Sequence, residues 1–175
     1  YTVTTIYGNS DTDAGFLACE FLEKIEIPNT VTTIGKYAFY GCEMIKKADL
    51  QNVKYIEEGA FVDCAALNEV IIPVVEYIGI GAFTLDKVYN GAPKFNEIVF
   101  PDTLKTIGNS AFEGCTSLAA ITIPETITYI GGKAFSNCIS LNSITMNNVE
   151  SIDNYAFKDT ISLSNLNCDS LVSIG

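Results

Sequence analysis

The chain has 175 residues, of which 48% are hydrophobic and 18% charged, and its net charge is −11. This composition indicates a folded protein and excludes intrinsic disorder. All ten basic residues are Lys and no His occurs, which argues against nucleic acid as a partner and removes the commonest general base and zinc ligand.

No apolar run approaches the roughly 18 to 20 residues that a membrane-spanning helix needs. We therefore expect no membrane insertion in this segment. The acidic surface also disfavours binding to an anionic membrane. Without His, the chain has few residue types that could act as a general base in an active site. The composition predicts neither an enzyme nor a cofactor.

An Ala-Phe pair recurs along the chain with a regular spacing. Its aromatic member falls at Phe39, Phe61, Phe83, Phe112, Phe135 and Phe157, with Phe16 as a weaker first member after Gly15. Successive gaps are 23, 22, 22, 29, 23 and 22 residues. A fixed period of this length indicates stacked structural repeats.

An Ile opens each repeat and follows the same spacing, at Ile34, Ile56, Ile78, Ile107, Ile130, Ile152 and Ile174. These positions predict one domain over residues 1–175. Its parts are a degenerate entry repeat at 1–33, the repeats 34–55, 56–77, 78–106, 107–129, 130–151 and 152–173, and a seventh repeat cut off after residue 175. We expect the solenoid to continue beyond that point.

Each repeat carries signals for two short strands and a compact turn. Leu118, Ile121 and Ile123 place apolar residues at alternate positions before Pro124, which predicts a strand with one face inward. The β-branched segment 126–130 predicts a second extended piece. The segment 109–115 predicts a single helical or 3₁₀ turn that ends at Gly114.

The repeated pattern I-G-x-x-A-F-x-x-C-x-x-L-x-x-I-x-I-P resembles the BspA-like leucine-rich repeat, over about residues 16–175. The resemblance implies a leucine-rich-repeat solenoid of the α/β type, mostly short strands with single helical or 3₁₀ turns. It also implies a right-handed coil of about six to seven repeats of 22–23 residues. Members of that family resemble exported adhesins that bind extracellular matrix or host cells, and they share no catalytic residues.

Five of the six Cys occupy one repeat position, three residues after Phe: Cys19, Cys42, Cys64, Cys115 and Cys138. Stacking would place them in an inward column, where Cys serves as a small hydrophobe. Buried free thiols are therefore the preferred interpretation. An oxidised adjacent pair and a metal site remain the alternatives, although zinc needs converging ligands.

Two further features stand outside the repeat pattern. Asn9, Asp11, Asp13 and Glu20 partly match a calcium-binding loop, but Ala14 stands where that loop needs Gly, so a solvated acidic loop is preferred and no metal is predicted. About six extra residues lie within 84–95, and this insertion is either a projecting hairpin bearing Val88 and Tyr89 that contacts a partner or a loop without a role.

Outward positions of the repeats supply the candidate binding residues. Strand columns that include Glu69 and Glu97 would face a bound macromolecule, and Tyr55, Tyr77 and Tyr129 share the position before the opening Ile. Exposed Tyr side chains stack on sugars or anchor protein interfaces, although Tyr is also a good packing residue on a sheet. The candidates are therefore Tyr55, Tyr77, Tyr129, Tyr89, Val88, Glu69 and Glu97.

The resulting hypothesis is a non-catalytic, cell-surface or secreted binding protein. It would be an adhesin that recognises a host protein or glycan, such as the extracellular matrix, through its repeat surface. The alternative is a structural spacer or stalk that displays another domain.

Overall fold

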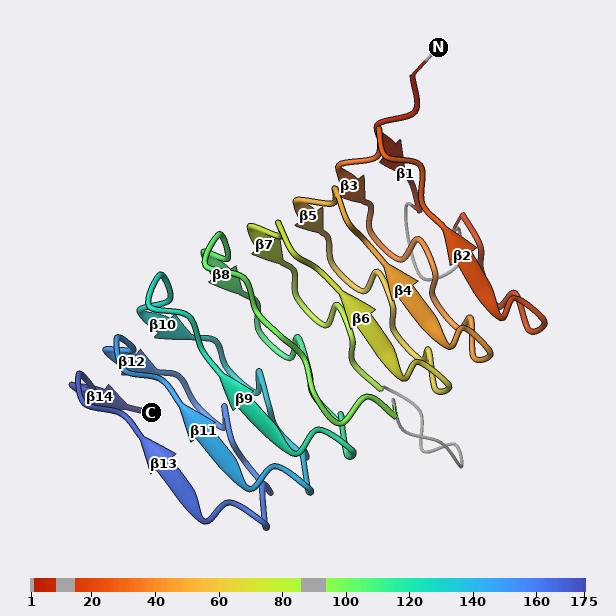
Figure 1. Cartoon of the computed structure of the whole chain (residues 1–175). Coiled ribbons are helices and arrows are strands. Elements are labelled where there is room, and N and C mark those ends of the chain that lie inside the picture. Colours follow the sequence, from red (N-terminus) through yellow and green to blue (C-terminus); the bar gives the residue numbers. More distant parts are fainter. Residues whose placement is uncertain (1, 9–14, 86–93) are drawn as a thin grey trace.

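The computed structural model describes residues 2–8, 15–85 and 94–175 (Figure 1). Within these ranges the chain forms fourteen short strands and no helix. The strands are β1 (Thr5–Ile6), β2 (Lys24–Glu26), β3 (Thr33–Ile34), β4 (Lys47–Asp49), β5 (Tyr55–Ile56), β6 (Glu69–Ile71), β7 (Tyr77–Ile78), β8 (Thr106–Ile107), β9 (Ala120–Thr122), β10 (Tyr129–Ile130), β11 (Ser143–Thr145), β12 (Ser151–Ile152), β13 (Asn165–Asn167) and β14 (Ser173–Ile174).

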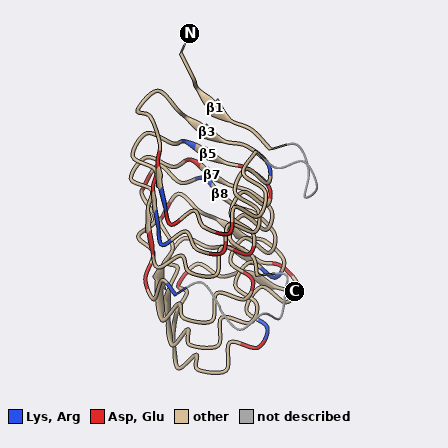
Figure 2. Cartoon of the chain, turned by 90° about the vertical axis from the view of Figure 1, so that its right-hand side faces the viewer, with Lys and Arg blue, Asp and Glu red and all other residues tan. Residues whose placement is uncertain are grey.

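The strands form two sets that alternate along the chain. The two-residue strands, called the short strands, pair in the order β1-β3-β5-β7-β8 and β10-β12-β14. The three-residue strands, called the long strands, pair as β2-β4-β6 and β9-β11-β13. Every pair is parallel and joins equivalent positions of successive repeats, as in Lys24↔Lys47↔Glu69. The predicted leucine-rich-repeat solenoid is therefore confirmed, and each repeat is one coil of it (Figure 2).

The strands arise where the sequence alternates apolar and polar residues. In β9 the middle residue Ile121 is buried while Ala120 and Thr122 are exposed, because successive strand residues point to opposite faces. A further inward column between the two strand sets holds Val31, Val53, Val75, Leu104, Ile127 and Val149, all 0–1% exposed. The core therefore runs through the centre of the coils.

The compact segment around each Ala-Phe pair is a series of hydrogen-bonded turns, so the predicted helical or 3₁₀ turn is wrong. Backbone N–H groups alternate between partners here: Ala38 donates to Gly35 O, and Phe39 donates to Ala60 O of the next coil. Tyr37 and Gly41 also have left-handed φ values of 54° and 70°. A regular helix is incompatible with both features.

Equivalent Phe side chains stack in a single file through the described coils. Successive ring centroids, in the order Phe16, Phe39, Phe61, Phe83, Phe112, Phe135 and Phe157, are 5.1 to 5.5 Å apart with nearly parallel planes. Offset-stacked aromatic pairs contribute about 0.5–1.5 kcal/mol beyond burial. The stack therefore joins each coil to both of its neighbours.

The chain re-enters the repeat pattern at Phe95 after the insertion. Phe95 is 1% exposed and occupies the position held by Leu67 and Leu118 in neighbouring coils. Its ring meets that of Phe83 edge-on, with centroids 6.3 Å apart. Val88 and Tyr89 lie outside the described residues, as do Asn9, Asp11 and Asp13 of the calcium-loop match, so the interpretations placed on them stay predictions.

Truncating a Phe in the middle of the file tests its contribution to stability. We expect Phe61→Ala to lower the free energy of unfolding by about 3–5 kcal/mol, because it removes a buried ring and leaves a cavity. Urea denaturation followed by circular dichroism measures this. Phe21→Ala is the matched control, since Phe21 is 92% exposed, and it should change stability little. Equal losses for the two variants would contradict the account.

Candidate binding surfaces

The long strands present one continuous surface, the long-strand face, in which outward residues line up in columns. One column runs Lys24, Lys47, Glu69, Glu97, Ala120, Ser143 and Asn165. Lys47 forms an ion pair of 2.8 Å with Glu69, so this predicted binding residue already has a partner. Glu97 is exposed and takes part in no ion pair recorded among the described residues.

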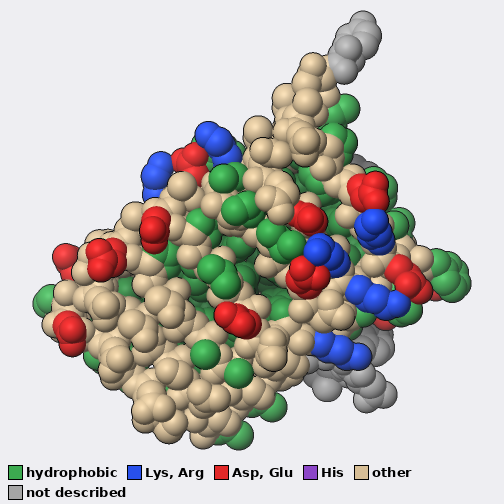
Figure 3. Space-filling view, viewed as in Figure 1, with side chains coloured by type: hydrophobic (Ala, Val, Ile, Leu, Met, Phe, Trp, Pro, Cys, Tyr) green, Lys and Arg blue, Asp and Glu red, His purple; other side chains and the backbone are tan. Residues whose placement is uncertain are grey.

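The character of the long-strand face changes along the solenoid. Lysines stand over β2 and β4, whereas the residues over β9, β11 and β13 are small or polar (Figure 3). Apolar side chains gather in the middle of this face. Val99 lies between these regions with 71% of its surface exposed.

The short strands carry the predicted tyrosines and form a second surface, the short-strand face. Tyr55 and Tyr77 are opposite each other in adjacent strands β5 and β7. Tyr129 begins β10, which belongs to the next sheet. The three side chains are 42%, 37% and 47% exposed, in that order. The structure therefore brings Tyr55 and Tyr77 together and leaves Tyr129 two coils further along.

Ile80 completes this apolar line and was not predicted from the sequence. It is 50% exposed and shares a hollow of about 410 Å³ with Tyr55 and Tyr77. It also borders a hollow of about 350 Å³ that reaches Tyr129. An alignment of the repeats could have revealed Ile80, because it is the apolar residue at a position that other repeats fill with polar residues or Gly. The equivalent residues are Lys36, Glu58, Asn109, Gly132 and Asn154. Ile80 is therefore the link between the two tyrosine sites.

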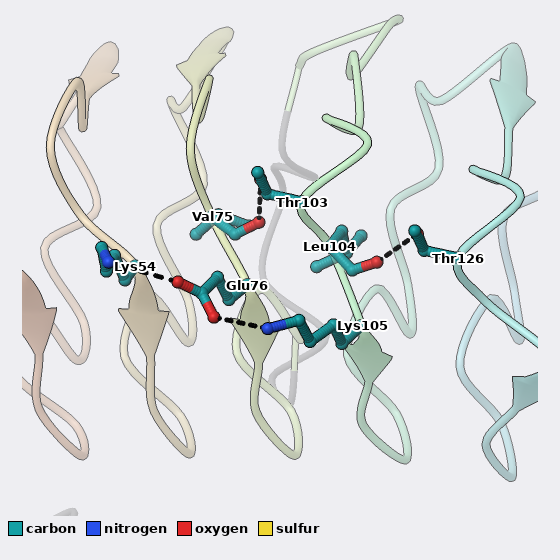
Figure 4. Close-up of polar contacts among 7 residues, drawn as sticks. All are labelled: Lys54, Val75, Glu76, Thr103, Leu104, Lys105 and Thr126. Carbon is teal, nitrogen blue, oxygen red and sulfur yellow. Dashed lines mark hydrogen bonds and ion pairs between the residues drawn. The ribbon is translucent and has the colours of Figure 1, made fainter.

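Ion pairs between coils lie next to the strands that bear Tyr55 and Tyr77. The Glu76 carboxylate lies 3.3 Å from Lys54 Nζ and 2.8 Å from Lys105 Nζ (Figure 4). Hydrogen bonds from Lys105 and Lys54 lower the pKa of Glu76. Both Lys side chains are at least half exposed, so these ion pairs add little to the stability of the fold.

Threonine hydroxyls add a second set of ties between coils beside these ion pairs. Thr103 donates to Val75 O at 2.9 Å, and Thr126 donates to Leu104 O of the preceding coil (Figure 4). Both Thr residues follow a Pro by two positions. These bonds hold successive coils in register next to the short-strand face.

Tyr129 is anchored differently from the other two tyrosines. Its hydroxyl donates to Asp153 Oδ2 of the next coil at 2.8 Å. This hydrogen bond raises the pKa of Tyr129. The hydroxyl is occupied and the ring stays 47% exposed, so Tyr129 offers a ring face held in one orientation.

The cysteine column is part of the core, as the sequence predicts. Four thiols are buried, and each donates to a Phe carbonyl of the preceding coil, as Cys42 does to Phe16 O at 2.9 Å. Burial raises the pKa of Cys42 to about 11 and of Cys138 to about 12. The structure has all six Cys as free thiols. A thiol held protonated in this way is a poor nucleophile and a poor metal ligand.

Residues 2–8, 15–85 and 94–175 form neither a metal-binding cluster nor a membrane-spanning helix. Among them, no three or more His, Cys, Asp or Glu side chains gather where they could hold a metal ion. No helix in that part of the chain has the length and apolarity to cross a bilayer. The two hollows on the short-strand face are therefore the candidate binding features.

Parallel strands stacked coil on coil, with Leu, Ile and Phe repeating inward every 22 or 23 residues, define a leucine-rich-repeat solenoid. The family model described as BspA type leucine rich repeat region matches residues 12–88 and 84–175, in six copies. The chain therefore belongs to the BspA-type leucine-rich repeat family. Repeat solenoids of this kind are in general binding scaffolds and not catalysts, and no catalytic family is indicated.

Solved bacterial structures share the architecture. A leucine-rich repeat protein from Bacteroides ovatus is 30% identical with a TM-score of 0.85, and the match covers 99% of this chain and 43% of that one. The Treponema pallidum leucine rich repeat protein TpLRR is 28% identical with a TM-score of 0.74, over 83% of this chain and 67% of that one.

A leucine rich cell surface protein from Faecalibacterium prausnitzii is 24% identical with a TM-score of 0.65, over 95% of this chain and 57% of that one. At that identity the likeness concerns the fold. The match with the B. ovatus protein covers 43% of that protein, so this chain spans less than half of its length. Among curated proteins, none matches the chain.

Thiol reactivity separates the buried cysteines from the partly exposed ones. In the folded protein we expect Ellman's reagent at pH 8 to react quickly with Cys19 and Cys168 only, because the other four thiols are buried and protonated. All six should react in 6 M guanidinium. The double variant Cys19→Ser/Cys168→Ser should lose the fast phase. Six fast-reacting thiols in the native protein would refute the buried column.

Proposed function

We propose that this protein is a non-catalytic, cell-surface or secreted binding protein, an adhesin that recognises a host protein or glycan through its short-strand face. The observation that carries the proposal is the line of Tyr55, Tyr77, Ile80 and Tyr129. These side chains are 37–50% exposed and border two adjoining hollows.

The chemistry of the line suits a macromolecular ligand. Tyr rings offer an apolar surface with a polar tip, which serves both for stacking on sugar rings and for anchoring protein interfaces. Lys36, Glu57 and Glu58 border the first hollow and can supply polar contacts around the rings. The hollows are open to solvent, which fits recognition of an extended ligand better than enclosure of a small molecule.

The rigidity of the face supports the proposal. Tyr55 and Tyr77 follow Lys54 and Glu76 directly, and these two residues form an ion pair across the coils. Because the backbone is already ordered by the solenoid, ligand binding need not order it. Preorganised surfaces of this kind have a smaller entropic cost of association.

The proposed cell-surface or secreted location rests on membership of the BspA-type leucine-rich repeat family. The net charge of −11 favours protein or glycan over nucleic acid as the partner. The alternative function, a spacer that displays another domain, is supported by the length of the B. ovatus relative, of which this chain covers 43%.

Binding to a glycan array and to immobilised matrix proteins tests the proposal. We expect the wild-type chain to bind at least one glycan class or matrix protein, and Tyr55→Ala/Tyr77→Ala to weaken that binding at least tenfold, as expected when interface anchors are lost. Tyr155→Ala is the matched control, because Tyr155 is 62% exposed and lies away from both hollows. Its affinity should stay within twofold of wild type.

Two results would contradict the proposal. Wild-type protein that binds nothing on either panel would favour the spacer. Equal losses in the double variant and in Tyr155→Ala would mean that the short-strand face is not the site.

A further inference from the structure

The long-strand face carries a hollow whose chemistry differs from that of the two hollows on the short-strand face. It lies over the segment Glu97–Asp102 and strand β9, and its volume is about 550 Å³. A neighbouring hollow of about 460 Å³ shares Asp102, Thr122 and Pro124 with it. We call the two together the valine groove, after Val99, which lies on its surface and is 71% exposed.

The groove exists because the sheet is incomplete at this point. Segment 97–99 pairs with β9 through the single bridge Glu97↔Ala120, whereas β9 and β11 pair at three positions. The outward side chain at the bridge is Ala120, in the column that holds Lys47 and Glu69 in earlier coils. A small side chain beside a loosely paired strand leaves the hollow open and Val99 uncovered.

Carboxylates surround the groove, and lysine is absent from its lining. The lining residues include Glu97 and Asp102 in one hollow and Glu125 in the other, and no cation occurs among those described. None of the three carboxylates forms an ion pair recorded among the described residues. The lysines of this face stand over β2 and β4 instead (Figure 3). The lining of the groove therefore combines apolar side chains, among them Val99, with three carboxylates.

We propose that the valine groove docks an extended basic segment of another protein, in which an aliphatic side chain stands between two Lys or Arg side chains. The aliphatic side chain covers Val99, and the two cations meet Glu97 on one side and Asp102 with Glu125 on the other. Charge complementarity selects this occupant, because an acidic or a purely apolar segment would leave the three lining carboxylates uncompensated or desolvated.

The sequence separation of Glu97 and Asp102 sets an upper limit on the distance that such a segment must span. Glu97 and Asp102 are five residues apart, which is at most about 16 Å of extended chain at ~3.3 Å per residue. In an extended peptide, side chains at alternate positions share one face. Lys-x-Val-x-Lys therefore spans about 13 Å between its two cationic positions, and the long Lys side chains cover the remainder.

This inference goes beyond the proposed function and does not depend on it, since the valine groove and the tyrosines belong to different strand sets. The two can fail separately. Loss of binding in the tyrosine variants tests the short-strand face, and the peptide experiment below tests the valine groove alone.

The test uses fluorescein-labelled, capped peptides and fluorescence anisotropy at low salt. The probe is Lys-Thr-Val-Thr-Lys, compared with Glu-Thr-Val-Thr-Glu and Lys-Thr-Thr-Thr-Lys. We expect the first peptide to bind the wild-type chain, the second not to bind, and the third to bind at least fivefold more weakly. Binding should weaken as salt screens the charges.

Variants of the chain locate the site. Glu97→Gln/Asp102→Asn/Glu125→Gln should weaken binding at least tenfold. The matched control, Glu20→Gln/Glu150→Gln/Asp169→Asn, removes the same net charge from exposed positions outside the groove and should leave affinity within twofold. Val99→Thr should weaken binding, whereas Val172→Thr, at a position 84% exposed, should not.

Three results would overturn the proposal: absence of binding by the first peptide at millimolar concentration, equal effects of the two triple variants, or equal affinity for the Val and Thr peptides. The second result would mean attraction by net charge alone. Because every substituted position is exposed, thermal melts of the variants should match that of the wild-type chain.

Discussion

Each coil of this chain donates alternate backbone N–H groups to carbonyls of the coil that follows it. Phe39 donates to Ala60 O, Phe61 to Ala82 O and Phe83 to Ala111 O, at 2.8–2.9 Å. A coil on its own would leave these groups to water and would expose its Phe ring. Since a single repeat can satisfy neither its backbone nor its apolar side, coils are stable only when stacked.

The same constraint decides which positions are free to carry function. Inward positions must hold residues that fit the column above and below them, as the Phe and Cys columns do. Outward positions on the strands meet solvent, so their side chains can differ from coil to coil without disturbing the stack. Binding sites on such a molecule are therefore patches spread over several coils, and the short-strand face and the valine groove are both of this kind.

The repeat alignment predicts the columns well because a column is a property of sequence spacing. Phe16 joins the file although Gly replaces the usual Ala before it, and Phe95 takes a Leu position after the insertion. The conformation of the turn at 35–41 could not be predicted from the repeat spacing in the same way. Its left-handed residue is Gly59 or Gly81 in two coils but Tyr37 and Ser110 in others, so composition alone gives a mixed signal.

The candidate sites were only partly predictable, for a related reason. The exposure of Tyr55, Tyr77 and Tyr129 follows from their place in the repeat, and Ile80 could have been found by asking which coil breaks a polar column. The partner of Glu69 depends on register with Lys47, which strand pairing supplies. The valine groove depends on how far segment 97–99 departs from β9, which no pattern within one repeat encodes.

Native-state hydrogen exchange tests the central claim most directly. If stacking makes the coils interdependent, the amides of Phe61, Phe83 and Phe112 should be among the slowest to exchange. Their opening free energies should agree with one another and with the global free energy of unfolding in urea. Exchange of the amides of one central coil at a much lower free energy than its neighbours would contradict the claim, because that coil would then open alone.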